Sequence, residues 1–211
     1  MGCEPTHAPE PVAALILAAG GGRRFGRPKA LIEVDGRLLV ERAVATARAG
    51  GCAPVVTVLG AEADTVRTEA DLDGAVPVDN PDWATGLGSS LRAGLAALGD
   101  SAAVAAVVLL VDMPGITPAA VRRLVALAGP DTLATAGYGN RRGHPVLLGR
   151  EHWAGVSALA IGDAGARGYL REHESSLLVV PCADVADSTD VDTPADLDRV
   201  VRGSIVAVVD G

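Results

Sequence analysis

The sequence predicts an α/β fold in which a mostly parallel β-sheet is covered by helices. Short apolar runs alternate with amphipathic stretches along the 211 residues, as strands and helices do in such a fold. The longest apolar run, residues 102–111, suits a strand buried on both faces and is far short of the roughly 20 residues that cross a membrane. Hydrophobic residues make up 49% of the chain and charged residues 21%, which is typical of one soluble globular domain.

Each expected element has a local signal. Apolar runs predict strands over 12–18, 54–59, 75–78, 104–111, 132–138, 146–148 and 177–181. A tight hairpin-like step is expected at 31–39 around Asp35-Gly36. Helices are expected over 40–49, 62–70, 90–98 and 163–173, and from Thr117-Pro118 and Thr193-Pro194. The expected N-caps are Ser89 or Ser90, Thr117, Asp163 and Thr193.

The helices and strands together span 12–202, which we expect to form one domain. Residues 1–11 hold three prolines and have neither a basic start nor an apolar core, so we expect a flexible tail rather than a signal peptide. Residues 203–211 are expected to form a C-terminal tail. The three cysteines include no CxxC pair, which favours a reducing cytoplasm over a disulfide framework or a zinc site.

The charge balance excludes one class of partner. The chain carries 26 acidic and 18 basic residues and a net charge of −8, whereas a general nucleic-acid binder is normally basic. We therefore expect no nucleic acid among its partners, and the shortness of the apolar runs leads us to expect no membrane. An anionic ligand would need a local concentration of positive charge.

Such a concentration follows the first expected strand. The segment 20–29 holds four glycines and four cations, and its last residue, Lys29, is the only lysine in the chain, whereas 17 residues are arginine. Glycines let backbone N–H groups approach a phosphate closely, and lysine supplies a compact point charge that arginine does not. The loop is neither a P-loop nor a GxGxxG dinucleotide loop, and a flexible surface turn is the alternative interpretation.

Carboxylates follow two other segments. Asp112 ends the most apolar strand, where it could hold Mg²⁺ for phosphate chemistry or simply cap a turn. Asp190 and Asp192 lie two residues apart near the C-terminus, so in an extended segment they share a face and either could complete the metal site. The alternative for Asp192 is helix capping together with Asp196.

The glycine-rich segment 17–29 resembles the signature L-A-A-G-x-S-x-R-x-G-x-x-K of the molybdopterin cytidylyltransferases, in a nucleotidyltransferase superfamily with a Rossmann-like domain. Gly20, Arg24, Gly26 and Lys29 fall on its fixed positions. The resemblance spans about residues 12–202 and implies a three-layer α/β/α, nucleotide-diphospho-sugar transferase-like fold. It implies that the triphosphate is bound by the residues of the loop, namely Leu17, Ala18, Ala19, Gly20, Gly21, Gly22 and Lys29.

The segment also departs from that signature. Gly22 stands where the family often has serine, and Phe25 stands where methionine is frequent. The Gly22 N–H would have to replace the contact of the missing hydroxyl. Sister guanylyltransferases resemble L-A-G-G instead, so Ala19 favours CTP over GTP on family grounds.

The resemblance assigns further site residues. It implies that Asp112 binds magnesium and that Asp192, rather than Asp190, is the second metal-contacting residue. A polar stretch resembling the family's N-x-x-[WY]-x-x-G-x-x-x-S implies a base and ribose pocket formed by Asn80, Gly86, Ser89 and Ser90, although a capped turn is the simpler interpretation.

On the acceptor side, His144 precedes a proline that favours an extended backbone and could aim its ring into the cleft. Arg167 could bind a phosphate. Structural or solvated roles are the alternatives for both residues.

The resemblance, together with the cationic loop and the carboxylates, implies an enzyme that transfers CMP from CTP to the phosphate of molybdopterin, with Lys29, Arg24 and Asp112 as catalytic residues and Mg²⁺ as cofactor. Its expected partners are CTP, the pterin acceptor and, transiently, a recipient molybdoenzyme or insertion chaperone. The alternatives are guanylyl or cytidylyl transfer to another phosphate acceptor, and a non-catalytic nucleotide-binding partner in cofactor insertion.

Overall fold

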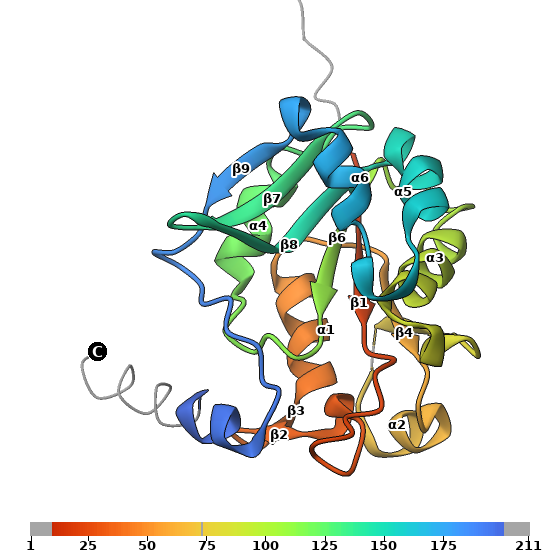
Figure 1. The fold of residues 1–211 in the computed structure, drawn as a ribbon, viewed down its shortest axis with the longest axis vertical. Helices are drawn as coiled ribbons and strands as arrows, with labels where there is room; N and C mark the ends of the chain where they lie inside the picture. The colour runs from red at the N-terminus through yellow and green to blue at the C-terminus, as the bar shows by residue number, and fades with distance from the viewer. Residues whose placement is uncertain (1–9, 73, 201–211) are drawn as a thin grey trace, which may run out of the picture.

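The structure, a computed structural model, describes residues 10–72 and 74–200. Its main sheet has seven strands, which are β1 (Val12–Leu17), β4 (Val55–Leu59), β5 (Ala75–Asp79), β6 (Ala105–Leu110), β7 (Leu133–Tyr138), β8 (Arg141–Gly149) and β9 (Leu178–Pro181). Their order in space is β5-β4-β1-β6-β8-β7-β9 (Figure 1). Among these strands β8 alone runs against its neighbours, which confirms the mostly parallel sheet.

Helices cover both faces of this sheet. The labelled α-helices of the described chain are α1 (Leu39–Ala49), α2 (Ala63–Glu69), α3 (Leu87–Ala97), α4 (Pro118–Val125), α5 (Trp153–Leu159) and α6 (Arg167–Glu172). One apolar core holds buried residues of α1, α2 and α4 against one face. A second core holds those of α3, α5 and α6 against the other, so the fold is the expected three-layer α/β/α sandwich (Figure 1).

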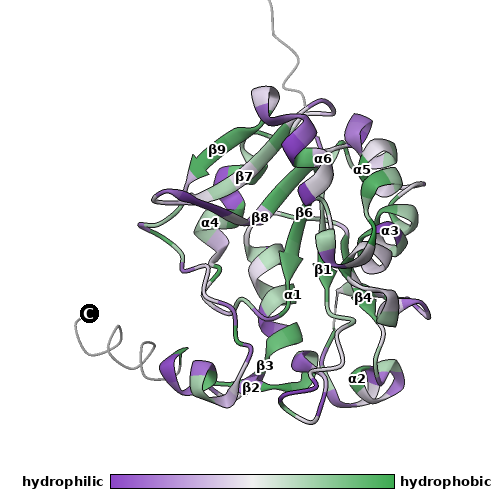
Figure 2. Ribbon diagram, in the orientation of Figure 1, coloured by the Kyte–Doolittle hydropathy of each residue, from purple (hydrophilic) through white to green (hydrophobic). Residues whose placement is uncertain are grey.

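The central strands are apolar on both faces because both faces are covered. All six residues of β1 are buried, and five of the six in β6. Figure 2 shows these strands in the colours of hydrophobic residues, with polar residues gathered on loops and outer helix faces. The two edge strands differ: β5 and β9 are largely exposed and each contains a proline, which limits pairing with another chain.

The predicted hairpin step is confirmed. β2 (Glu33–Val34) pairs with β3 (Arg37–Leu38) in antiparallel fashion, and Asp35 and Gly36 between them have φ of 52° and 75°. Positive φ at both central residues is the geometry of a type I′ turn. The step leads directly into α1.

The expected start of α3 is wrong. The helix begins at Leu87, so Ser89 and Ser90 lie inside its first turn and cap nothing. Gly86, with φ of 111°, occupies the N-cap position, and the Leu87 N–H donates to the Asp163 carboxylate at 3.4 Å. The cap therefore comes from a residue distant in the chain, which a local pattern does not reveal.

Two other helix predictions need correction. Asp163 does not cap a long helix over 163–173; it lies in a 3₁₀ turn (Gly162–Ala164), and α6 begins at Arg167. Gly165, with φ of 54°, separates the two because this backbone conformation interrupts a right-handed helix. α5 was not predicted at all.

The other helix caps agree with prediction. The Thr117 hydroxyl accepts from the Ala120 N–H at 3.4 Å at the start of α4. A helix occupies 194–200 of the described chain, and the N–H and hydroxyl of Thr193 donate to Asp196 at 2.8 and 2.7 Å.

β8 is longer than predicted and contains an irregularity that matters for the site. It extends through Gly143-His144-Pro145, and its pairing with β7 shifts register between Thr135 and Ala136. Two residues on β8, His144 and Pro145, are thereby left out of the ladder. Such a bulge re-aims a side chain.

The expected C-terminal tail lies outside the described residues, as does the expected N-terminal tail apart from residues 10 and 11. Cys52 and Cys182 are both free and buried. Across 10–72 and 74–200, none of the helices has the length and apolar character needed to cross a bilayer.

Candidate functional site

Two adjoining cavities open at the carboxyl ends of the parallel strands, where ligands bind in open α/β sheets. The first, of about 730 Å³, we call the glycine-loop cavity. It is lined by Leu17, Ala19, Gly20, Gly22, Arg23, Arg24, Phe25, Lys29, Trp83, Ala84, Gly86, Leu87, Ser90, Leu110, Val111, Asp112, Asp163, Arg167 and Asp192.

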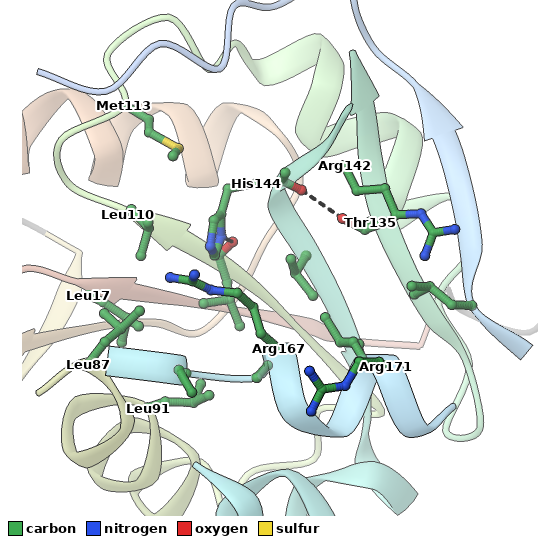
Figure 3. A pocket seen from close by; sticks show the side chains of 18 of the residues that line it. Leu17, Leu87, Leu91, Leu110, Met113, Thr135, Arg142, His144, Arg167 and Arg171 are labelled. Carbon is green, nitrogen blue, oxygen red and sulfur yellow. Dashed lines mark hydrogen bonds between the residues drawn. The ribbon is translucent and has the colours of Figure 1, made fainter. Parts of the chain in front are cut away.

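The second, of about 580 Å³, we call the β8 cavity. Its wall includes residues of β6, β8 and α6 (Figure 3). The two cavities share the lining residues Leu17, Leu87, Leu110 and Arg167. Arg167 therefore lines both cavities.

The glycine-rich loop is shaped by two residues with positive φ. Gly22 has φ of 56° and Gly26 has φ of 71°, and the Gly22 carbonyl accepts from the N–H groups of Phe25 and Gly26 at 2.8 and 3.1 Å. A Cβ at Gly22 would lie 1.9 Å from the Arg27 carbonyl oxygen. This conformation therefore excludes the serine that the resembled signature carries at that position.

Lys29 is held at the end of this loop. It begins a 3₁₀ turn (Lys29–Leu31) whose next two residues, Ala30 and Leu31, are fully buried and anchor the backbone. Its ammonium lies 2.7 Å from Asp112 Oδ2 and also contacts Asp192 Oδ1. The structure thus places one cation between two carboxylates.

The surroundings of Lys29 favour its charged form. Burial alone would lower the pKa of Lys29, but the carboxylates of Asp112 and Asp192 outweigh burial and hold that pKa above its ordinary value. The hydrogen bond from Lys29, followed by its charge and that of Arg24, lowers the pKa of Asp192. Arg24 approaches Asp192 at 3.7 Å with a side chain that is 67% exposed, so its contribution is screened by water.

Backbone hydrogen bonds bring the two carboxylates together. β1 and β6 are paired with Leu17 opposite Leu110, so the glycine-rich loop and Asp112 leave the sheet side by side. The Val191 N–H donates to the Asp112 carbonyl at 2.8 Å, and this bond places the next residue, Asp192, beside Lys29. Asp190 lines the β8 cavity instead.

The two carboxylates suit a divalent ion whose remaining ligands are phosphates and waters. Asp112 Oδ1 is covered and has no hydrogen-bond partner. The described part of the chain contains no group of three or more His, Cys, Asp or Glu residues able to hold a metal. Mg²⁺ in phosphate sites is commonly held by one or two carboxylates together with waters and phosphates. The donor set therefore suits such an ion and does not suit one held by protein alone.

Asn80 and Ser89 support the pocket but do not line it. The buried Asn80 amide donates to the hydroxyls of Ser89 and Ser90 at 2.8 and 3.0 Å, and its oxygen accepts from the Asp82 N–H at 3.0 Å. Neither Asn80 nor Ser89 borders either cavity, whereas Gly86 and Ser90 border the glycine-loop cavity. In the loop itself, Gly21 faces the Trp83 ring and Ala18 is buried.

His144 lies in the wall of the β8 cavity. The bulge in β8 turns its ring towards β6, where Nδ1 is 3.2 Å from the Val108 carbonyl oxygen. A carbonyl only accepts, so Nδ1 carries the proton. Burial lowers the pKa of His144, against the smaller raising effects of the Val108 carbonyl and of Asp112, so the ring favours its neutral form.

The β8 cavity combines apolar walls with arginines. Figure 3 shows Arg167 extending from α6 towards His144, with Leu17, Leu87 and Leu91 below it. Arg142 is paired with Glu174 at 2.9 Å, whereas Arg167 and Arg171 form no ion pair within the described chain. Sequence reasoning missed Arg171, although its spacing of four from Arg167 places both on one helix face. It also missed Asp163, which borders the glycine-loop cavity.

Comparison with known proteins identifies a family model and a relative that match most of this chain. Residues 14–177 match the model of the MobA-like NTP transferase domain. The chain is 39% identical over 198 residues to nicotine blue oxidoreductase from Paenarthrobacter nicotinovorans, covering 90% of this chain and 96% of the relative.

Solved structures extend the likeness to three dimensions. The crystal structure of an Rv0371c homologue from Mycobacterium sp. strain JC1 is 31% identical, with a TM-score of 0.81 over 93% of this chain and 98% of that one. The Rv0371c structure in complex with manganese, from Mycobacterium tuberculosis H37Rv, is 26% identical with a TM-score of 0.76 and covers 91% and 98% of the two chains.

Proposed function

The chain belongs to the MobA-like NTP transferase family, and we propose that within it the protein transfers CMP from CTP to the phosphate of molybdopterin. Nucleotidyl transfer is the chemistry of that family. The acceptor, the base and the metal are our proposals. One observation carries them: Lys29 from the glycine-rich loop meets Asp112 and Asp192 in a cavity that adjoins a second, arginine-lined one.

In the proposed reaction an oxygen of the acceptor phosphate attacks the α-phosphorus of CTP. A new P–O bond forms, the bond from the α-phosphorus to the bridging oxygen breaks, and pyrophosphate leaves with that electron pair. No covalent enzyme intermediate is needed. The residues act by positioning the two substrates and neutralising charge.

Each part of the site has a role in this scheme. Backbone N–H groups of Gly20–Gly22, together with Arg24 and Lys29, would bind the triphosphate and stabilise the leaving pyrophosphate. Asp112 and Asp192 would hold a divalent ion, which supplies charge neutralisation at the phosphates when bound. We take this ion to be Mg²⁺, and a related structure contains manganese.

The β8 cavity would receive the acceptor. Its apolar walls suit a flat fused ring, and Arg167, at the junction of the cavities, suits the acceptor phosphate. His144 is held neutral there and would contact the ring system by hydrogen bonding. Transient contact with a molybdoenzyme or insertion chaperone would follow as the route for product release.

The test is product analysis by mass spectrometry with purified protein, Mg²⁺, a molybdopterin source and each of the four NTPs in turn. We expect pyrophosphate and a pterin cytosine dinucleotide with CTP, and neither product without the acceptor. A preference for GTP would contradict the choice of base. Pyrophosphate release with a sugar phosphate instead of molybdopterin would contradict the choice of acceptor.

A second candidate is an oxidoreductase activity, which the 39% identity to nicotine blue oxidoreductase favours. The apolar β8 cavity would then receive the dye, and the reductant would enter the adjoining glycine-loop cavity. Incubation with nicotine blue and NADH distinguishes the two: loss of NADH absorbance without any nucleotidyl product would favour the second candidate. Absence of both signals with NTP binding retained would favour a non-catalytic partner.

A further inference from the structure

We infer that in the nucleotide-free protein the Lys29 ammonium occupies the position of the divalent cation, so that nucleotide and cation bind interdependently. The inference deepens the proposed function and rests on its assignment of Asp112 and Asp192 as cation ligands. It adds a property that this assignment does not contain: Lys29 should oppose cation binding when no nucleotide is present.

The geometry of the free site carries this inference. The Lys29 ammonium lies 2.7 Å from Asp112 Oδ2 and contacts Asp192 Oδ1. It therefore bridges the oxygens that a divalent ion would use. An ammonium and a divalent ion carry the same sign of charge, so both cannot lie against these oxygens without strong repulsion.

The Lys29 ammonium leaves part of the negative charge of the two carboxylates without a counter-charge. One ammonium faces two carboxylates, and Arg24, which approaches Asp192 at 3.7 Å, is largely exposed. Asp112 Oδ1 is covered and lacks a hydrogen-bond partner. A single positive charge therefore neutralises the pair incompletely, and a divalent ion would neutralise it fully.

Lys29 can leave without disturbing the fold. Its backbone is anchored by the buried Ala30 and Leu31, while its side chain is a flexible four-carbon stem lining the glycine-loop cavity. Gly20 and Gly22 line the same cavity. A triphosphate bound there would offer the ammonium new anionic partners and thereby free both carboxylates for the cation.

The chemistry of lysine suits this exchange. An arginine would grip a carboxylate with two parallel hydrogen bonds in a fixed fork and would release it less readily. In a chain with 17 arginines, the one lysine is found where a cation must change partners.

The test measures Mn²⁺ binding to the full chain by electron paramagnetic resonance, without nucleotide. Lys29→Met removes the charge and keeps the length of the side chain. We expect it to bind Mn²⁺ about tenfold more tightly than the wild type, or more, as removal of one adjacent like charge implies. Arg27→Met is the matched control, because Arg27 lies in the same loop but pairs with Glu69 at 2.9 Å and lines neither cavity.

Several results would overturn the inference. The inference is wrong if the Lys29→Met variant binds Mn²⁺ no more tightly than the wild type. It is also wrong if Arg27→Met gains as much affinity for Mn²⁺ as Lys29→Met, because that would indicate a general charge effect. A double variant, Lys29→Met with Asp112→Asn, should lose the gain; retention would place Mn²⁺ elsewhere. Circular dichroism and thermal melting establish that each variant is folded.

A second measurement adds CTP without acceptor, with Mn²⁺–CTP in buffer as the reference for binding in solution. We expect CTP to tighten Mn²⁺ binding to the wild type and to have a much smaller effect in Lys29→Met. Equal gains in both proteins would contradict the exchange of partners. These readouts need neither molybdopterin nor turnover, so failure of CMP transfer to molybdopterin and failure of this inference are distinguishable.

Discussion

The Nζ atom of Lys29 lies 2.7 Å from Oδ2 of Asp112, although 83 positions separate the two residues in the chain. The contact exists because β1 and β6 are neighbours, so that the segments following them leave the sheet together. The glycine-rich loop and the carboxylates thereby form one site. Replacements on either side of this contact should affect nucleotidyl transfer in different ways.

Replacing Lys29 tests the need for a compact cation. We expect Lys29→Ala to lower pyrophosphate release from CTP about 100-fold or more, because phosphate charge loses a fixed partner. Lys29→Arg should also fall, by about tenfold, because the guanidinium stays paired with the carboxylates and its planar group is hard to place in a site where Lys29 is only 17% exposed. Full activity in Lys29→Arg would contradict the role given to the lone lysine.

Replacing single aspartates tests which of them bind the metal ion. Asp112→Asn should reduce pyrophosphate release about 100-fold or more and raise the Mg²⁺ concentration needed for half-maximal rate. Asp190→Asn is the matched control, because Asp190 lines the β8 cavity and makes no contact with Lys29. Its Mg²⁺ dependence should equal that of the wild type, and a shift as large as that of Asp112→Asn would argue against Asp192 as the second ligand.

Gly22 offers a test of the loop conformation. Gly22→Ser restores the residue of the resembled signature, but its Cβ would meet the Arg27 carbonyl at 1.9 Å in a backbone with φ of 56°. We expect a loss of about 1–3 kcal/mol in the free energy of unfolding, measured with urea, together with weaker CTP binding. For comparison, Gly20→Ala has no atom within 4 Å of its Cβ and should change the unfolding free energy by less than about 0.5 kcal/mol.

His144 should make stability depend on pH. Burial lowers its pKa in the folded protein below the 6.5 of an unfolded chain. The unfolded state therefore takes up the proton first, so the stability associated with His144 is complete above about pH 6.5 and is lost as the pH falls through that value towards the folded pKa. Urea unfolding at pH 7.5 and 5.5 should show a larger loss for the wild type than for His144→Gln. Equal losses would mean that His144 is not held neutral.

Arg142 tests the separation of the two cavities. Arg142 lines the β8 cavity alone, where it pairs with Glu174 at 2.9 Å. Arg142→Met should raise the KM for the acceptor several-fold, on the scale of one charge-assisted contact worth about 1 kcal/mol, and leave the affinity for CTP unchanged. A change confined to CTP would place the acceptor elsewhere.

Part of the site could be predicted because it depends on local sequence. Glycines after an apolar strand predict a loop that exposes backbone N–H groups, and a carboxylate such as Asp112 at the end of another apolar strand lies where ligands bind in parallel sheets. The pairing of Thr193 with Asp196 was visible in their spacing of three residues. The signals themselves, a strand followed by glycines, a strand ended by a carboxylate and a spacing of three residues, are all local.

The rest depends on contacts between distant segments. The first N–H of α3 is met by Asp163, 76 positions away, so neither Ser89 nor Ser90 was needed as a cap. A bulge in β8 directs the His144 side chain to the cavity wall, and no local sequence pattern predicts this bulge. Asn80 matches a motif that implies a ligand-binding residue, yet its amide nitrogen donates its hydrogen bonds to two serine hydroxyls.

The two halves of the chain contribute mainly to different cavities. The chain up to Asp112 supplies the glycine-rich loop and most of the glycine-loop cavity, and Asp163, Arg167 and Asp192 reach that cavity from the later half. The β8 cavity is walled largely by β7, β8 and α6. A relative that keeps the loop, Asp112 and Asp192 can therefore change the walls of the β8 cavity, and with them the molecule it modifies, while it retains the residues that would handle the triphosphate.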